Sequence, residues 1–176
     1  MLSNLDRVSR PPFLVPIAEL AQRPGARLRV QLAGPLHVEL SSARLTDDDV
    51  VADVTLESQG DTMTVTGTAT GWWEGECRRC LETTGGEVTV QLSEVFEPHP
   101  TEGETYPLGR DAVDLEPALR EALALALPLA PLCGENCAGP DPDAHPVGVA
   151  EDAEDEADDE PATDPRWGAL DTLKFD

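Results

Sequence analysis

Apolar and polar residues alternate along much of the first hundred positions. In residues 27–32, Leu28, Val30 and Leu32 fall on one side and polar side chains on the other. Alternation with a period of two is typical of a half-buried β-strand. Comparable patterns predict further strands at 36–40, 50–57, 62–71 and 87–92. Because short turns connect these segments, we expect an α+β fold with a mostly antiparallel β-sheet, barrel-like or sandwich-like in form.

The segment 62–71 has the clearest alternation in the chain. Five threonines share one face, while Met63 begins a second face of small and apolar residues. If this register continues, Trp73 lies on the Met63 face and Trp72 lies on the threonine face. The two indole rings are therefore predicted to point in opposite directions.

One segment has helical periodicity. Five apolar residues recur at helical spacing, namely Leu115, Leu119, Ala122, Leu123 and Ala126. Asp114 is a suitable N-cap, and Pro117 is tolerated in the first turn. The pattern stops before Pro128, so one main helix is predicted over residues 115–127. This helix leads the chain toward Cys133.

Composition divides the chain into three parts. Residues 1–140 hold the strands, the helix and all four cysteines, and are expected to form one domain. In the next part, eight of the ten residues from Glu151 to Glu160 are Asp or Glu. Hydrophobicity this low does not offset the entropy of ordering, so residues 141–163 are predicted to be a disordered acidic linker. Residues 164–176 are predicted to form a short helix, because one face would carry Trp167, Leu170 and Leu173.

The chain is strongly acidic, with a formal net charge of -23 and a sequence pI near 4.2. This charge repels nucleic acid at long range, since proteins gain affinity for phosphates through Lys and Arg. Contact with RNA is therefore expected to be local, or to pass through a basic partner such as a ribosomal protein. Residues 1–16 lack the apolar run of a signal peptide, and no segment approaches the roughly 20 apolar residues of a membrane span. We expect a cytoplasmic location, a reducing environment and no membrane contact.

All four cysteines lie in two close pairs, Cys77 with Cys80 and Cys133 with Cys137. Zn²⁺ takes four thiolate or imidazole ligands in a tetrahedral shell, and a Cys-x-x-Cys turn presents two thiolates to one ion. The pairs predict a structural zinc site that joins two distant segments. A closed shell of four thiolates has no open position for water, which argues against metal catalysis. Incidental thiols, a disulfide, and a thioredoxin-like redox pair at Cys77 and Cys80 are the alternatives.

Trp72, Arg78 and Arg79 surround the first cysteine pair. Aromatic and guanidinium groups stack on unpaired RNA bases, so these residues are candidate contacts for RNA or another partner. Alternatively, the arginines offset the acidic surface and ease the gathering of thiolates. His145 follows Cys137 by eight residues, which makes it a candidate for a replacement ligand. No Walker loop, Rossmann fingerprint, nucleophile elbow or His-Glu-x-x-His motif is present, so no catalytic residue is assigned.

The order of these motifs resembles the YceD family, the large ribosomal RNA subunit accumulation proteins. Several strands precede Gly-Glu-Cys-Arg-Arg-Cys-Leu-Glu at 75–82, and a strand follows it. Next come Val-Asp-Leu-Glu-Pro at 113–117 and Leu-Pro-Leu-Ala-Pro-Leu-Cys at 127–133. The resemblance covers roughly residues 10–140 and the Asp-Pro-Arg-Trp sequence near the C-terminus. Many members carry two more cysteines after the second pair, and residues 139–145 of this chain lack both.

The resemblance implies a role in the synthesis, processing or accumulation of large-subunit (23S) ribosomal RNA. The family offers no established catalytic residues to transfer to this sequence. We therefore expect a non-enzymatic ribosome-biogenesis factor whose partner is large-subunit rRNA, its precursor, or a basic large-subunit ribosomal protein. Two rival hypotheses are an acidic protein-interaction module that binds a basic ribosomal protein, and a Cys-x-x-Cys thiol-disulfide oxidoreductase.

Overall fold

The protein's structure, a computed structural model, describes residues 11–140. Three features predicted from sequence lie outside the described residues: the acidic linker at 141–163, the short helix at 164–176, and His145. Each of these stays a prediction.

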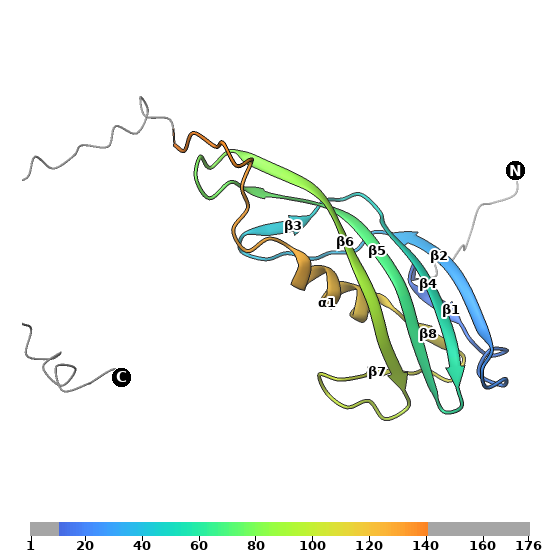
Figure 1. Ribbon diagram of the computed structural model, residues 1–176. Helices are drawn as coiled ribbons and strands as arrows, with labels where there is room; N and C mark the ends of the chain where they lie inside the picture. The colour runs from blue at the N-terminus through green and yellow to red at the C-terminus, as the bar shows by residue number, and fades with distance from the viewer. Residues whose placement is uncertain (1–10, 141–176) are drawn as a thin grey trace, which may run out of the picture. The chain divides into compact units, whose positions relative to one another are not determined.

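The described part of the chain is built on one sheet of six strands (Figure 1). The strand order is β2-β4-β5-β6-β7, and β3 pairs with a further part of β5. Every pairing in this sheet is antiparallel except that of β6 with β7. The strands are β2 (Arg27–Gly34), β3 (Ala43–Leu45), β4 (Val50–Gln59), β5 (Thr62–Glu76), β6 (Thr83–Glu97) and β7 (Tyr106–Pro107).

The predicted antiparallel sheet is confirmed, but the barrel-like form, one of the two forms that the sequence predicts, is wrong. Among residues 11–140, β2 and β7 are the two ends of the strand order and do not pair with each other, so the sheet is open. The connection after β6 explains this difference. The chain returns to lay the two-residue strand β7 parallel to β6, and a strand this short does not extend the sheet toward closure.

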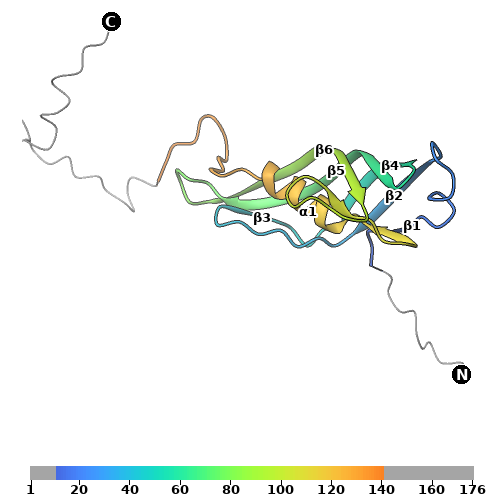
Figure 2. The same cartoon turned by 90° about the horizontal axis from the view of Figure 1, so that it is seen from below.

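One face of the sheet carries the remaining elements, as Figure 2 shows. The strands β1 (Leu14–Pro16) and β8 (Ala112–Asp114) pair as a separate two-stranded sheet, and α1 (Glu116–Ala126) follows directly. The helix packs mainly against β6 and also against β5. The hydrophobic core therefore lies between this face of the large sheet and the layer formed by α1, β1 and β8.

The alternation seen in the sequence determines which side of β5 is buried. Met63, Val65 and Ala69 are buried in the core, as the sequence predicts. Trp72 is 50% exposed, whereas Trp73 is half-buried and packs against the core, so the predicted opposite orientation of the two indoles is confirmed.

The helix matches its predicted position to within one residue at each end. It begins at Glu116, so the N-cap is Leu115 and not the predicted Asp114. The Asp114 carboxylate nevertheless accepts a hydrogen bond from the Glu116 backbone N–H at 3.0 Å. Leu119 and Leu123 are fully buried on the face toward the sheet, while Leu125 is 82% exposed on the other face. The helix ends at Ala126, and its direction delivers the following residues to the far end of β5 and β6.

The predicted strand at 36–40 does not form. Leu36 and Val38 are buried as the alternation predicts, but the segment makes only an isolated bridge between Glu39 and Arg44. The reason is that the chain turns back on itself at once, so its backbone bonds go to the neighbouring β3 segment. The Leu40 N–H, for example, donates to the Ala43 carbonyl at 2.9 Å.

Candidate metal centre

The first cysteine pair lies in the loop that connects β5 to β6. The last ladder pair of this hairpin is Glu76 with Thr83. Within the loop, the Cys77 N–H donates to the Glu82 carbonyl, and the Leu81 N–H donates to the Cys77 carbonyl, each at 2.9 Å. Leu81 has a φ of 63°, in the left-handed region that side chains rarely adopt. The tight turn that results presents two thiols from one end of the hairpin.

The second cysteine pair reaches this loop because the segment after α1 is fastened to the hairpin end. Figure 1 shows this segment, in orange, running from the helix to the far end of β5 and β6. The Arg78 N–H donates to the Pro131 carbonyl at 2.9 Å, and the Ser42 hydroxyl donates to the Pro128 carbonyl at 3.0 Å. Gly75 permits this approach, since a Cβ there would lie 3.3 Å from the Pro131 ring and 2.5 Å from the Ser42 carbonyl oxygen.

The four cysteine sulfurs form one cluster. The Cys77 and Cys137 sulfurs lie 3.8 Å apart, as do those of Cys80 and Cys133. All four sulfurs lie within 4.8 Å of one another. The two remote segments predicted to meet therefore do meet, and each of these two contacts of 3.8 Å joins one segment to the other.

These separations fit a tetrahedral metal ion. With Zn–S bonds of about 2.3 Å, the edge of a regular tetrahedron of sulfurs is about 3.8 Å. The two cross-segment distances match this edge, and the limit of 4.8 Å for the whole cluster leaves only a small contraction to make. The four cysteines could therefore hold one metal ion.

The pKa values of the cysteine thiols also favour the binding of a cation at the cluster. Backbone N–H groups of Cys80, Cys133 and Arg79 point at the Cys77 sulfur and lower the pKa of that thiol to about 6. The neighbouring sulfurs of Cys137, Cys77 and Cys80 raise the pKa of the Cys133 thiol to about 12. One thiolate thus forms readily, and its charge opposes the next. A divalent cation would relieve this repulsion and release protons on binding.

Burial is graded across the cluster. Cys77 is fully buried, Cys80 and Cys137 are half-buried, and Cys133 is exposed. The thioredoxin-like alternative requires a low-pKa cysteine at a helix N-terminus. Cys77 instead lies in a hairpin loop, beneath the segment that follows α1.

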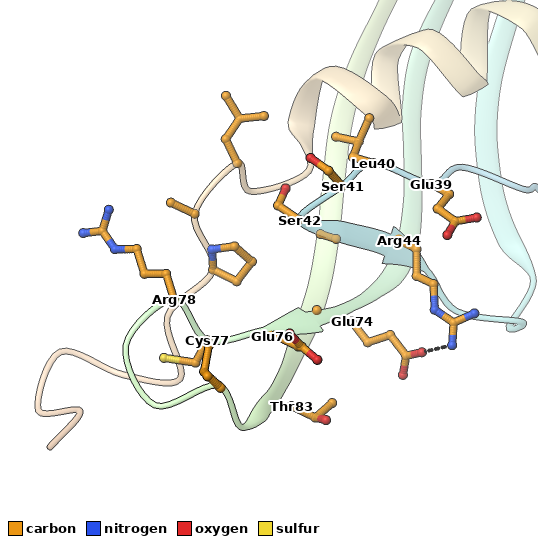
Figure 3. A pocket seen from close by; sticks show the side chains of 16 residues that line it. Glu39, Leu40, Ser41, Ser42, Arg44, Glu74, Glu76, Cys77, Arg78 and Thr83 are labelled. Carbon is orange, nitrogen blue, oxygen red and sulfur yellow. Dashed lines mark hydrogen bonds and ion pairs between the residues drawn. The ribbon is translucent and has the colours of Figure 1, made fainter. Parts of the chain in front are cut away.

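A groove of about 580 Å³ lies beside the cluster (Figure 3). It runs between β3, the end of β5 and the segment after α1, and Cys77 and Arg78 line one end. The dashed line in Figure 3 marks the ion pair of Arg44 with Glu74 at the other end. Sequence reasoning did not find Ser42 and Gly75, whose positions in the groove wall depend on pairing between β3 and β5.

Two of the three candidate contact residues lie at the cluster. Arg78 and Arg79 are exposed in the loop between Cys77 and Cys80. Trp72 lies within β5, four residues before the strand ends at Glu76, which corresponds to about 13 Å along the strand. The structure therefore groups the two arginines with the thiols and places Trp72 apart from them.

Comparison with known proteins shows which family this chain resembles. A family model described as "Large ribosomal RNA subunit accumulation protein YceD" matches residues 65–174, a range that includes all four cysteines. Proteins of Mycobacterium tuberculosis and Mycobacterium bovis are 33% identical over 138 residues, which span 73% of this chain and 67% of theirs. A Mycobacterium leprae protein is 32% identical over 144 residues, spanning 73% of this chain and 64% of its own. All three are described as uncharacterized proteins, and no solved structure matches.

Residues 11–140 include no helix with the length and apolar composition that crossing a bilayer requires.

Proposed function

Because the chain belongs to the YceD family, we propose that it is a non-enzymatic ribosome-biogenesis factor that supports the synthesis, processing or accumulation of 23S rRNA. The family description supports a role in large-subunit rRNA accumulation. The observation that carries the finer proposal is the convergence of four thiols from two remote segments. In this proposal the cluster binds a structural zinc ion.

The role of the proposed ion is structural, because it links two segments that are distant in sequence. It would join the β5–β6 loop to the segment after α1, through Cys77 and Cys80 on one side and Cys133 and Cys137 on the other. Four thiolate ligands complete a tetrahedral shell, so no coordination position remains for substrate or water. The ion would therefore shape a surface for contact with a partner and would not perform chemistry.

Metal analysis of the purified chain tests this site. Purified under reducing conditions, the protein is expected to contain one zinc ion per chain, and Cys77→Ser is expected to lose it. Gly134→Ala serves as a control that alters the second cysteine segment and leaves every thiol in place, because a Cβ there meets nothing within 4 Å. Zinc well below one equivalent in the unaltered chain would contradict the proposal, and iron in its place would correct the identity of the metal.

The contact surface for RNA is proposed to include Arg78 and Arg79. Both side chains are exposed at the hairpin end, within a chain whose overall charge opposes RNA. Crosslinking in cells followed by sequencing is expected to recover large-subunit rRNA or its precursor. Replacing both arginines with Ala should reduce this recovery, whereas Arg23→Ala, another exposed arginine, should not. Trp72→Ala separately tests the exposed indole.

Depletion of the protein in cells tests the biological role. The ratio of 23S to 16S rRNA is expected to fall, and expression of the unaltered chain is expected to restore it. The Cys77→Ser variant, produced at the same level, should restore it less well. An unchanged ratio after complete depletion would remove the proposed role in rRNA accumulation.

A second candidate function is an acidic protein-interaction module that binds a basic large-subunit ribosomal protein. The net charge of -23 favours this partner, because opposite charge speeds association and suppresses competing acidic partners. Deletion of residues 150–176 is expected to weaken retention on ribosomal particles if the acidic segment makes the contact. Unchanged retention would discard this mode of binding.

The third hypothesis, a thiol-disulfide oxidoreductase, has its own test. It requires that Cys77 and Cys80 reduce or oxidise a disulfide substrate with turnover. Turnover of a model disulfide by the chain, abolished in Cys77→Ser, would favour this hypothesis over the structural site.

A further inference from the structure

Two contacts between sulfurs join the two segments of the cluster. Cys80 faces Cys133 and Cys77 faces Cys137, both at 3.8 Å. A disulfide bond is about 2.0 Å long, so each pair must close by about 1.8 Å. Both partners of each pair lie on loops, at the hairpin end and in the irregular segment after α1, where small shifts meet little packing resistance.

We propose that the cluster is also a site of reversible oxidation, at which Cys80 joins Cys133 and Cys77 joins Cys137. The oxidant is a hydroperoxide, of which hydrogen peroxide is the simplest. Cys133 is exposed and Cys80 and Cys137 are half-buried, so a dissolved oxidant reaches both pairs, although Cys77 itself is fully buried.

The chemistry balances without any further reagent. One sulfur of the pair Cys80 and Cys133 attacks a peroxide oxygen as its thiolate, the O–O bond breaks, and a sulfenic acid and, after protonation, one water form. The other sulfur of the pair then attacks the sulfenic sulfur and expels the hydroxyl group as a second water. Two thiols are oxidised to one disulfide while one hydrogen peroxide is reduced to two waters. A second hydrogen peroxide converts Cys77 and Cys137 in the same way.

Oxidation would replace the proposed zinc ion by two disulfide bonds as the link between the two segments. Each disulfide joins the same two segments that the proposed zinc ion joins, so the hairpin end keeps its contact with the segment after α1. A sulfur in a disulfide is no longer a thiolate ligand, so a bound metal ion would be released. This consequence for the metal rests on the proposed function, whereas the disulfide connectivity depends only on the arrangement of the sulfurs.

Peptide mapping of the full chain tests the connectivity. The reduced protein is exposed to hydrogen peroxide, and the remaining thiols are blocked with N-ethylmaleimide. The chain is then digested with trypsin and a glutamate-specific protease without reductant. Cleavage after Arg78 and Arg79 separates Cys77 from Cys80, and cleavage after Glu135 separates Cys133 from Cys137. Each cysteine therefore lies on its own peptide, and mass spectrometry identifies every pairing.

The expected result is the Cys80–Cys133 crosslink and the Cys77–Cys137 crosslink, both reversed by dithiothreitol. In Cys133→Ser, the Cys80 crosslink should disappear while the Cys77–Cys137 crosslink still forms. A crosslink between two cysteines of the same segment, such as Cys77 to Cys80, would overturn the proposal. Oxidation only to sulfinic acid, or only to crosslinks between two chains, would overturn it as well. The key measurement uses the unaltered chain, so it does not depend on how a variant folds.

Running the experiment on zinc-free and zinc-loaded protein separates the two proposals. Release of zinc is followed with a chromophoric chelator, and one equivalent is expected per oxidised chain. If the chain binds no zinc but forms the two crosslinks, the zinc site fails and the oxidation site stands. If zinc is bound but the crosslinks differ, the oxidation site fails and the zinc site stands.

Discussion

The two ends of the long β5–β6 hairpin differ in the interactions that are available to stabilise them. At the end under α1, Phe96, Leu119 and Leu123 are fully buried in one continuous hydrophobic core. At the other end, Cys77 is the only buried residue of the connecting loop, and Pro131 is the only one in 128–140. Apolar burial contributes stability wherever the chain packs, whereas a thiol cluster contributes it only when its sulfurs are bridged.

This contrast separates the fold of the protein from the shape of its candidate site. The core end is a sheet with a helix across one face, and its residues follow simple periodic patterns. The cysteine end has too little buried surface to hold its two segments together by packing. Two hydrogen bonds, to the Pro131 and Pro128 carbonyls, and the close approach at Gly75 align them. Removing whatever bridges the four sulfurs should therefore loosen the cysteine end and leave the core end folded.

The largest effect is expected from a cavity in the core end. Leu119→Ala removes a fully buried side chain between α1 and the sheet, and should lower the free energy of unfolding by about 2–5 kcal/mol. Leu125→Ala, on the same helix but 82% exposed, is the matched control and should change stability little. Urea denaturation in the presence of zinc measures both. Equal effects of the two substitutions would mean that α1 does not supply the core.

The second effect is local loss of order on metal removal. A zinc chelator under reducing conditions should speed amide hydrogen exchange in residues 77–82 and 128–137. Amides of β4 and of the central part of β5 should keep their protection, because the core end does not use the metal. If the chelator instead abolished the far-ultraviolet circular dichroism, the two ends would form one cooperative unit and the contrast would fail.

The sequence predicted the core end well because its signals are local and periodic. The faces of β5 and the span of α1 follow from alternation, helical spacing and Pro128. It also predicted that the two cysteine pairs meet, since four thiols with one tetrahedral ion is a simple chemical solution. What it missed was non-local: the open sheet depends on the parallel return of β7, and the short segment at 36–40 pairs with its neighbour by a single bridge.

Gly75 is another residue that sequence reasoning missed, and it provides the third test. A Cβ at Gly75 would collide with the Ser42 carbonyl oxygen and press on Pro131, so Gly75→Ala should push the second cysteine pair away. Zinc affinity is expected to fall about tenfold or more, as it does when supporting contacts of a metal site are lost. Gly134→Ala is the control, because a Cβ there meets nothing within 4 Å although Gly134 lies between two cysteines. Competition with a chelator of known affinity measures both variants, and equal losses would contradict the role of Gly75.

The smallest expected effect depends on pH and belongs to the core end. Glu94 is half-buried on the inner side of β6, and burial together with the charge of Glu121 raises its pKa. A raised pKa in the folded state means that the folded chain binds this proton more tightly than the unfolded chain does. The ionised carboxylate therefore opposes folding at neutral pH, and this penalty disappears as the pH falls below the ordinary pKa of a glutamate.

Glu94→Gln mimics the protonated form of this side chain. It is expected to raise the free energy of unfolding at pH 7 by a fraction of the Leu119→Ala effect, and the gain should shrink steadily as the pH is lowered toward 4. Glu87→Gln makes the same charge change at an exposed position of the same strand and serves as the control. Zinc content should be the same in both variants at pH 7, because Glu94 lies in the end of the hairpin that apolar packing stabilises. A change in zinc affinity in Glu94→Gln alone would show that the two ends are energetically coupled, and would replace the division between them with a single network.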